Sequence, residues 1–254
     1  MLTIPLRSAT LHYESRGTHG PAVVLVHGSG GNSTVWRSQL EALADIARVI
    51  AIDLPGHGGS AGSFATVDEA AEVVREFADA LEVPKIVIGG HSIGGAIAQT
   101  FALAAPDRTA GVVLVGTGAR LRVLPKLIDT LEHDHPAGVR FMTDLAVAAG
   151  ASAPVKRRVF DETLRAPARS LIGAFRACDR FDVMTRLGEI KAPTLVVTGV
   201  EDQLTPQKYA EYLARHIPGA RLVLVPGAGH YVQIERPDEV SAAIRSFLLE
   251  RVTA

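Results

Sequence analysis

Cysteine is nearly absent from this chain: Cys178 is the only one among 254 residues. A lone cysteine cannot form a disulfide within the chain, and it is only weak evidence for a reducing compartment. We interpret Cys178 as a small apolar side chain that fills space on a helix, rather than as a reactive thiol. Cross-links therefore do not hold this fold together.

Excess charge of one sign and long apolar runs are also missing. The 26 basic and 27 acidic side chains leave a formal net charge of −1, so no strong field attracts nucleic acid or an anionic membrane surface. No apolar run approaches the roughly 18 residues that span a bilayer, and residues 1–7 lack the segments of a secretory signal. We therefore expect a cytoplasmic protein with no membrane span and no nucleic-acid partner.

Hydrophobic residues, in contrast, make up 47% of the chain, and a chain of 254 residues can bury about three quarters of its unfolded surface. Short apolar runs rich in β-branched residues lie at 22–26, 49–52, 85–88, 111–115, 194–198 and 221–225. Strands that are apolar on both faces are typical of a parallel sheet covered by helices. Because helix signals separate these runs, the sequence predicts an α/β fold with a mostly parallel, doubly wound sheet.

Several of the intervening segments carry recognisable helix starts. The capping box Thr66-Val-Asp-Glu69 predicts a helix to about Leu81. Thr205-Pro206 places a cap residue before a proline at the first helical position, and Arg236-Pro237 opens the last helix in the same way. Residues 93–105 are small and apolar throughout, as expected for a helix buried against the sheet.

The alternation of strands and helices stops between residues 118 and 187. Amphipathic patterns at 123–133, 139–148, 155–164 and 168–180 predict a helical insertion there, which we interpret as a cap or lid. The core domain then comprises residues 1–117 and 188–254. At its start, residues 2–6 and 9–14 predict an N-terminal hairpin at the sheet edge.

The strongest local pattern is Gly90-His-Ser-Ile-Gly94, between a predicted strand and a predicted helix. In that context G-x-S-x-G is typical of a nucleophile elbow, a tight turn that lifts a serine hydroxyl clear of the sheet. The turn needs glycine two residues before and two after the serine to avoid clashes, and the helix N-terminus behind it favours negative charge. The pattern predicts Ser92 as a nucleophile; the alternative is a plain glycine-rich turn.

A serine hydroxyl needs a base, and the base needs an acid that holds its tautomer. His230 follows the predicted strand at 221–225, and Asp202 follows the predicted strand at 194–198. Both therefore lie at the carboxyl edge of the sheet, where open α/β sheets gather reacting groups. Glu201 is a rival for the role of the acid. The sequence thus predicts a catalytic triad of Ser92, Asp202 and His230.

The loop His27-Gly-Ser-Gly-Gly31 follows the first core strand. We expect the backbone amides of Ser29 and Ile93 to form an oxyanion hole, in which each well-placed donor contributes about 3–4 kcal/mol. The same loop, with Asp53 ending the next strand, imitates a dinucleotide-binding site. That alternative puts the third glycine of its fingerprint at Ser33 and leaves the predicted triad without a role.

Across nearly its whole length the chain resembles the lidded α/β-hydrolase family. The likeness rests on His27-Gly-Ser-Gly-Gly31, Asp53-Leu-Pro-Gly-His-Gly-Gly-Ser60, Gly90-His-Ser-Ile-Gly94, Gly199-Val-Glu-Asp202 and Gly229-His230, and the order Ser, Asp, His is also that of the family. The resemblance implies catalysis without a metal or cofactor, and structural roles for His27, His57 and His91. Serine rather than aspartate at the nucleophile position disfavours the dehalogenase and epoxide-hydrolase branches.

These observations predict a serine hydrolase that cleaves small carboxylic esters through an acyl-enzyme at Ser92, with a small-molecule ester or lactone as its partner. Alternatives on the same triad are an enol-lactonase, a hydrolase of carbon–carbon bonds in diketones and a cofactor-free perhydrolase. A ligand receptor with a hydrolase fold is the alternative from a different class. The sequence carries no signal for an oligomeric state.

The predicted insertion is rich in arginine. We interpret these side chains as solvated outer faces of helices, and the alternative is that one of them meets a substrate carboxylate. The arginines are Arg120, Arg122, Arg140, Arg157, Arg158, Arg165, Arg169, Arg176, Arg180 and Arg186.

Overall fold

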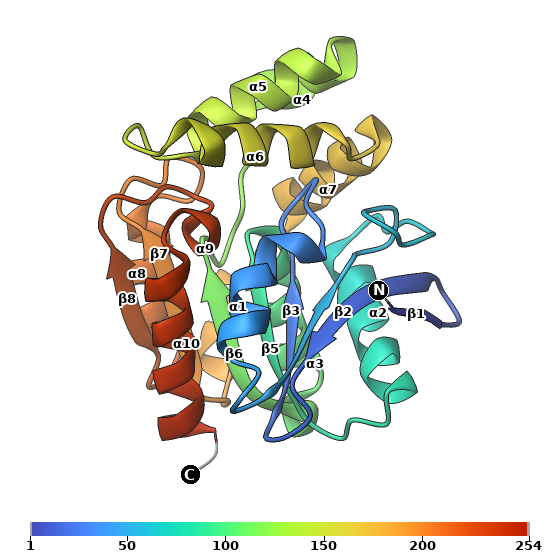
Figure 1. Ribbon diagram of the computed structural model, residues 1–254, viewed down its shortest axis with the longest axis vertical. Coiled ribbons are helices and arrows are strands. Elements are labelled where there is room, and N and C mark those ends of the chain that lie inside the picture. The colour runs from blue at the N-terminus through green and yellow to red at the C-terminus, as the bar shows by residue number, and fades with distance from the viewer. Residues whose placement is uncertain (1, 253–254) are drawn as a thin grey trace.

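Eight strands pair into one sheet in the computed structural model, which describes residues 2–252 (Figure 1). The strands are β1 (Leu2–Pro5), β2 (Thr10–Arg16), β3 (Ala22–Val26), β4 (Arg48–Ile52), β5 (Ile86–His91), β6 (Thr109–Val115), β7 (Thr194–Gly199) and β8 (Arg221–Val225). Their order is β1-β2-β4-β3-β5-β6-β7-β8. The hairpin β1–β2 joins the sheet antiparallel, and the other strands run parallel, which confirms the predicted sheet.

The strand β5 extends three residues beyond its predicted end and reaches His91. The run of β-branched residues ends at Ile88, and the following Gly89 and Gly90 have low strand propensity. However, β5 lies between β3 and β6. Gly89 and Gly90 pair with both of these strands, and His91 pairs with β6. Pairing with these neighbours outweighs the low strand propensity of glycine and carries β5 directly to Ser92.

Helices cover both faces of the sheet (Figure 1). The α-helices are α1 (Arg37–Ala42), α2 (Val67–Ala80), α3 (Ile93–Ala104), α4 (Pro125–His133), α5 (His135–Ala146), α6 (Ala153–Leu164), α7 (Ala168–Arg180), α8 (Gln207–His216), α9 (Val232–Glu235) and α10 (Pro237–Arg251). The helices α2, α3 and α8 pack in one hydrophobic core, and α1 and α10 pack in a second core on the other face. No helix within residues 2–252 is long and apolar enough to cross a bilayer.

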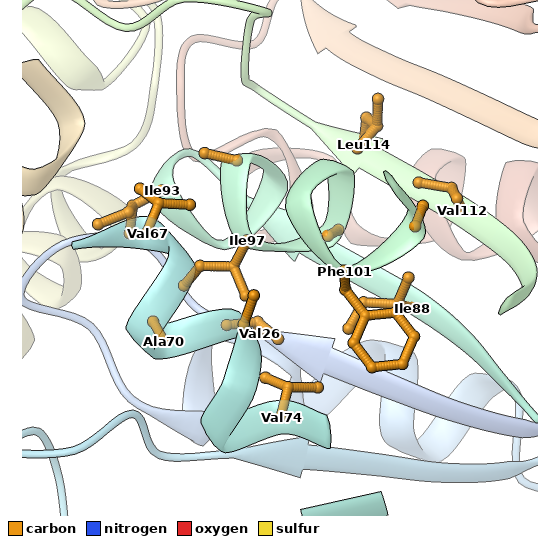
Figure 2. Close-up of a cluster of buried hydrophobic side chains, with 14 of the residues drawn as sticks. Val26, Val67, Ala70, Val74, Ile88, Ile93, Ile97, Phe101, Val112 and Leu114 are labelled. Atoms are coloured by element: carbon orange, nitrogen blue, oxygen red, sulfur yellow. The ribbon is translucent and has the colours of Figure 1, made fainter. Parts of the chain in front are cut away.

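The core between α2, α3 and the sheet positions the start of α3 (Figure 2). Val74 of α2 packs with Ile97 and Phe101 of α3 and with Ile88 of β5, and all four side chains are buried. Full burial of such side chains stabilises the fold by about 1.5–3 kcal/mol each. Because α3 lies between the sheet and α2, it needs no continuous polar face, which explains its largely apolar sequence; the buried Gln99 donates to the carbonyl oxygens of Gly95 and Gly118.

Of two predicted N-caps, Thr66 caps its helix in the structure and Thr205 does not. At α2, the Thr66 hydroxyl accepts a hydrogen bond from the amide of Glu69, as the capping box predicts. The Glu69 carboxylate accepts from Ala65, one residue before the expected amide. At α8, however, Thr205 does not cap the helix, which begins at Gln207 after Pro206. The Thr205 hydroxyl points instead to a buried carboxylate described below.

The helices α4, α5, α6 and α7 all fall between β6 and β7 in the chain, where the sequence predicted four helical segments. Figure 1 shows them together beyond one end of the strands, at the top of the view, away from the C-terminal end of α10. The helix α7 contacts α3, which begins at the carboxyl end of β5. The insertion therefore stands over the edge of the sheet where the predicted site lies.

Candidate active site

Ser92 occupies the turn between β5 and α3 in a strained backbone conformation. Its φ of 55° and ψ of −118° are unusual for a residue with a side chain, and such conformations cost about 1–3 kcal/mol. Surrounding hydrogen bonds hold the turn: the Ser92 amide donates to Val115 O (3.0 Å), and the Thr117 hydroxyl donates to Ser92 O (2.8 Å). The strand–turn–helix placement predicted for Ser92 is therefore present.

The two glycines of the motif are required by close backbone contacts. A Cβ atom on Gly90 would overlap the carbonyl group of Gly94, and a Cβ atom on Gly94 would overlap the carbonyl oxygen of Val26. In both cases the obstacle is backbone rather than a flexible side chain. The helix α3 can therefore approach β3 and β5 closely only if these positions lack side chains.

We expect Gly94→Ala to lower the free energy of unfolding by about 3 kcal/mol, because the added methyl group has no room beside the Val26 backbone. Gly188→Ala is the matched control, since a Cβ atom built there meets nothing within 4 Å beyond its own local stretch of chain. The control should change the unfolding free energy by less than about 0.5 kcal/mol. Urea denaturation measures both values, and equal losses in the two variants would contradict the steric argument.

His230 and Asp202 form a buried, hydrogen-bonded pair. The His230 Nδ1 atom lies 2.9 Å from Asp202 Oδ2, and both side chains are almost fully buried. Since Nδ1 faces a carboxylate, it carries the proton and leaves Nε2 as the basic nitrogen of the ring. The rival acid, Glu201, is exposed. The structure thus joins Asp202, and not Glu201, to the predicted base.

Thr205 completes this arrangement and was missed as a site residue in the sequence. Its hydroxyl donates to Asp202 Oδ2 (2.7 Å) and lies 3.2 Å from His230 Nδ1. The amides of Leu204 and Thr205 donate to Asp202 Oδ1. The spacing of Asp202 and Thr205 is that of a turn in which an aspartate accepts from its own following backbone, and this signal was available in the sequence.

A cavity of about 290 Å³ brings the predicted residues together. Ser92, His230 and Ser29 all line it, with Asp202 behind His230. The apolar part of the wall comes mainly from the insertion and includes Leu121, Val123, Leu124, Leu127, Met142, Phe175 and Cys178. No hydrogen bond joins the Ser92 hydroxyl to His230 within residues 2–252, and such bonds often tighten only when a substrate binds.

The amides predicted to hold an oxyanion are free of protein partners. Within the part of the chain that the structure describes, neither the Ser29 amide nor the Ile93 amide donates a hydrogen bond. Ile93 begins α3, so its amide is one of the unsatisfied donors of a helix N-terminus. Ser29 lies in the tight loop closed by the Gly31 amide and Gly28 O. Both donors thus remain available to an anion.

Three histidines near the site have structural partners. His27 Nδ1 donates to Gly28 O, and its Nε2 accepts from the Leu54 amide; burial and the neighbouring His57 lower its pKa to about 4. Burial likewise lowers the pKa of His57 and of His91. His91 Nε2 donates to the carbonyl oxygen of His230 (2.9 Å). These rings are therefore neutral supports of the loops around the cavity.

Asp53 is fully engaged inside the protein, which counts against the dinucleotide alternative. Its Oδ1 accepts from the Ser33 amide (2.6 Å), and its Oδ2 accepts from Gly59 and lies 2.8 Å from His12 Nδ1. The Asp53 side chain is 3% exposed. A ribose hydroxyl therefore has no access to it.

The buried Cys178 lies on α7 beside the cavity, with its Sγ atom 3.8 Å from the Ser29 hydroxyl. Burial raises the pKa of this thiol to about 12. Because only the thiolate is an effective nucleophile, this supports the interpretation of Cys178 as an unreactive filler.

Glu235 ties the insertion to the loop of His230 and had no recognisable signal in the sequence. One carboxylate oxygen accepts from the amides of Ala148 (2.9 Å) and Gly229 (3.1 Å). The His230 amide donates to Ala146 O (2.6 Å), so two connections hold the end of α5 against this loop. Burial raises the pKa of the Glu235 carboxyl, although the two amide bonds oppose that shift.

The raised pKa of Glu235 makes stability fall as pH rises, because the folded protein keeps a proton that the unfolded chain has already released. Glutamine accepts the same two hydrogen bonds without ionising. We therefore expect the unfolding free energy of Glu235→Gln, relative to the unchanged protein, to increase between about pH 4 and about pH 7. Urea denaturation across this range tests it, with Glu201→Gln as the exposed control. Parallel curves for Glu235→Gln and the unchanged protein would refute the assignment.

Comparison with known proteins shows the family of the chain. The Alpha/beta hydrolase family model matches residues 23–243. A pimeloyl-[acyl-carrier protein] methyl ester esterase from Nitrosomonas europaea is 30% identical over 91% of this chain and 96% of its own length.

Solved structures give the same result. A thermophilic esterase from Thermogutta terrifontis, solved with malate bound, superposes with a TM-score of 0.90 and 31% identity, covering 99% of each chain. The enol-lactonase from Burkholderia xenovorans has a TM-score of 0.88 and 25% identity, over 98% of this chain and 100% of its own. With its sheet, its strained serine turn and these matches, the chain belongs to the alpha/beta hydrolase family.

Proposed function

We propose that this protein is a serine hydrolase of small carboxylic esters, with Ser92 as nucleophile, His230 as general base and Asp202 as the acid that orients the histidine. One observation carries the proposal: a strained serine and a histidine held by a buried carboxylate line the same cavity. Esterase relatives over nearly the whole chain support it.

In the proposed mechanism, His230 Nε2 takes the proton of the Ser92 hydroxyl while Oγ attacks the ester carbonyl carbon. The carbonyl oxygen becomes an oxyanion between the amides of Ser29 and Ile93, at the positive end of α3. The tetrahedral intermediate then expels the alkoxide, which takes the proton from His230 and leaves an acyl group on Ser92. Water attacks this acyl-enzyme and gives a proton to the same histidine, which returns it to Ser92 Oγ as the acid leaves.

The helices α4–α7 act as a lid in this proposal. Leu127 of α4, Met142 of α5 and Phe175 of α7 wall the cavity and keep bulk water away from the reacting atoms. A volume of about 290 Å³ is at the lower end of small-molecule sites, which favours short acyl chains. The division into a core of residues 1–117 and 188–254 and a lid of residues 118–187 remains part of the proposal.

The test combines active-site labelling with a substrate panel. A fluorophosphonate probe should add its mass to the peptide that contains Ser92, and nitrophenyl esters should be turned over many times per active site, fastest for short chains. Slow single turnover together with a ligand-induced rise in melting temperature would favour a receptor instead. Absence of the adduct from folded protein would remove the proposed nucleophile.

A further inference from the structure

The charged side chains around the cavity have one sign. Arg122 and Lys208 line it, whereas its lining contains no aspartate or glutamate. The remaining wall is largely apolar, and Asp202 is withdrawn behind His230. Charges interact more strongly beside apolar walls than in open water. The lining residues of the cavity therefore carry two positive charges and no negative one, although the Asp179 carboxylate lies behind the lining, where it accepts from the Val123 amide.

Most arginines of the insertion region have partners away from the cavity, as expected for side chains on solvated helix faces. Five of them form ion pairs: Arg120 with Asp182, Arg157 with Asp161, Arg158 with Glu162, Arg176 with Glu132, and Arg186 with Glu189. Arg140 lies over the ring of Phe160. Among the ten, Arg122 is the one on the lining of the cavity, and it donates to the backbone carbonyl of Asp179 rather than to a carboxylate.

Lys208 is the second cation. It is exposed in the first turn of α8, and within residues 2–252 it has no ion pair and no hydrogen bond. It lines the main cavity and also an adjoining one of about 310 Å³, together with Tyr209. Arg120 lies in that second cavity. Lys208 thus borders both cavities, so its ammonium group can contact a substrate that reaches from one into the other.

We propose that the substrate is a carboxylate-bearing ester, such as a half-ester of a dicarboxylic acid, whose free carboxylate binds Lys208 with support from Arg122. This inference rests on the proposed esterase function and names the substrate class of that site. The apolar wall receives the methylene chain, and the ammonium and guanidinium groups bind the charged end. A neutral ester of equal length leaves both cations unused.

The experiment compares pairs of ethyl esters matched in length: monoethyl succinate, glutarate and adipate against ethyl butyrate, valerate and hexanoate. Release of ethanol is measured for each. We expect kcat/KM for the best half-ester to exceed that of its neutral partner by about fivefold or more, and the advantage to shrink as salt rises. Equal or lower values for every half-ester would overturn the inference while leaving the esterase proposal intact.

Variants of Lys208 test whether its charge causes the preference for half-esters. Lys208→Met keeps the aliphatic stem without the charge and should lower the half-ester to neutral-ester ratio by about fivefold. Lys208→Arg should restore most of the ratio. The control is Lys85→Met, an exposed lysine before β5, which should leave both activities unchanged. An unchanged ratio in Lys208→Met would overturn the role of Lys208.

A binding measurement separates this inference from the esterase proposal. Ser92→Ala protein should bind monoethyl adipate more tightly than Ser92→Ala/Lys208→Met protein, as calorimetry can determine. This result stands even if no ester is turned over. If esters are hydrolysed but the two affinities are equal, the carboxylate site is wrong and the proposed function survives.

Discussion

Replacing Ser92 by alanine is expected to lower kcat for short nitrophenyl esters by about 10,000-fold to 1,000,000-fold, the range seen when a triad loses its nucleophile. The substitution removes the only atom that forms the acyl-enzyme in the proposed mechanism. The two amides and the cavity remain, so a small residual rate over water should persist. Steady-state turnover and fluorophosphonate labelling of the two proteins measure the effect.

The Ser92→Ala variant must be shown to be folded. The strained backbone at this position makes Ser92→Gly a suitable control. Alanine keeps the strain at φ 55°, whereas Ser92→Gly relieves it, so the glycine variant should unfold at a higher temperature than the alanine variant. Both should be equally inactive. Retention of full esterase activity by folded Ser92→Ala would end the case for this nucleophile.

Asp202→Asn is expected to lower kcat by about 10,000-fold. The asparagine side chain can present an N–H group to His230, which then turns its proton-bearing nitrogen toward Ser92 and ceases to be a base. The contacts at Asp202 Oδ1 come from amides, so the carbonyl oxygen of asparagine can keep them and the fold should survive. Turnover rates and thermal unfolding of the variant measure the two effects separately.

Glu201→Gln is the matched control, because it neutralises the adjacent carboxylate, which is exposed and lies outside the hydrogen-bonded pair. Its turnover should stay within about twofold of the unchanged protein. If Glu201→Gln lost activity and Asp202→Asn did not, the acid would be assigned wrongly. The turnover of Thr205→Val should lie between those of Glu201→Gln and Asp202→Asn, since this substitution removes one hydrogen bond to Asp202 and leaves the carboxylate in place.

Local sequence patterns predicted elements well where neighbouring residues set the structure. The runs at 22–26 and 221–225 coincide with β3 and β8, and the Thr66 cap opens α2. Predicted boundaries were wrong where pairing with strands distant in the sequence sets the end of an element. At β5, for example, β3 and β6 hold Gly89 and Gly90 in the sheet. Thr205 was assigned to a helix start, yet its hydroxyl binds Asp202, because a buried carboxylate is the stronger acceptor.

The amino-acid sequence by itself determined the strand order along the chain, the strained glycine-flanked turn at Ser92 and the identity of the residues at three strand ends, since these depend on local periodicity and steric limits. Only the tertiary structure decided which carboxylate meets His230, that Glu235 joins the insertion to its loop, and that Arg122 and Lys208 face the cavity. These contacts join residues far apart in the chain or depend on which way a side chain points. Their partners are selected by packing, which no local pattern records.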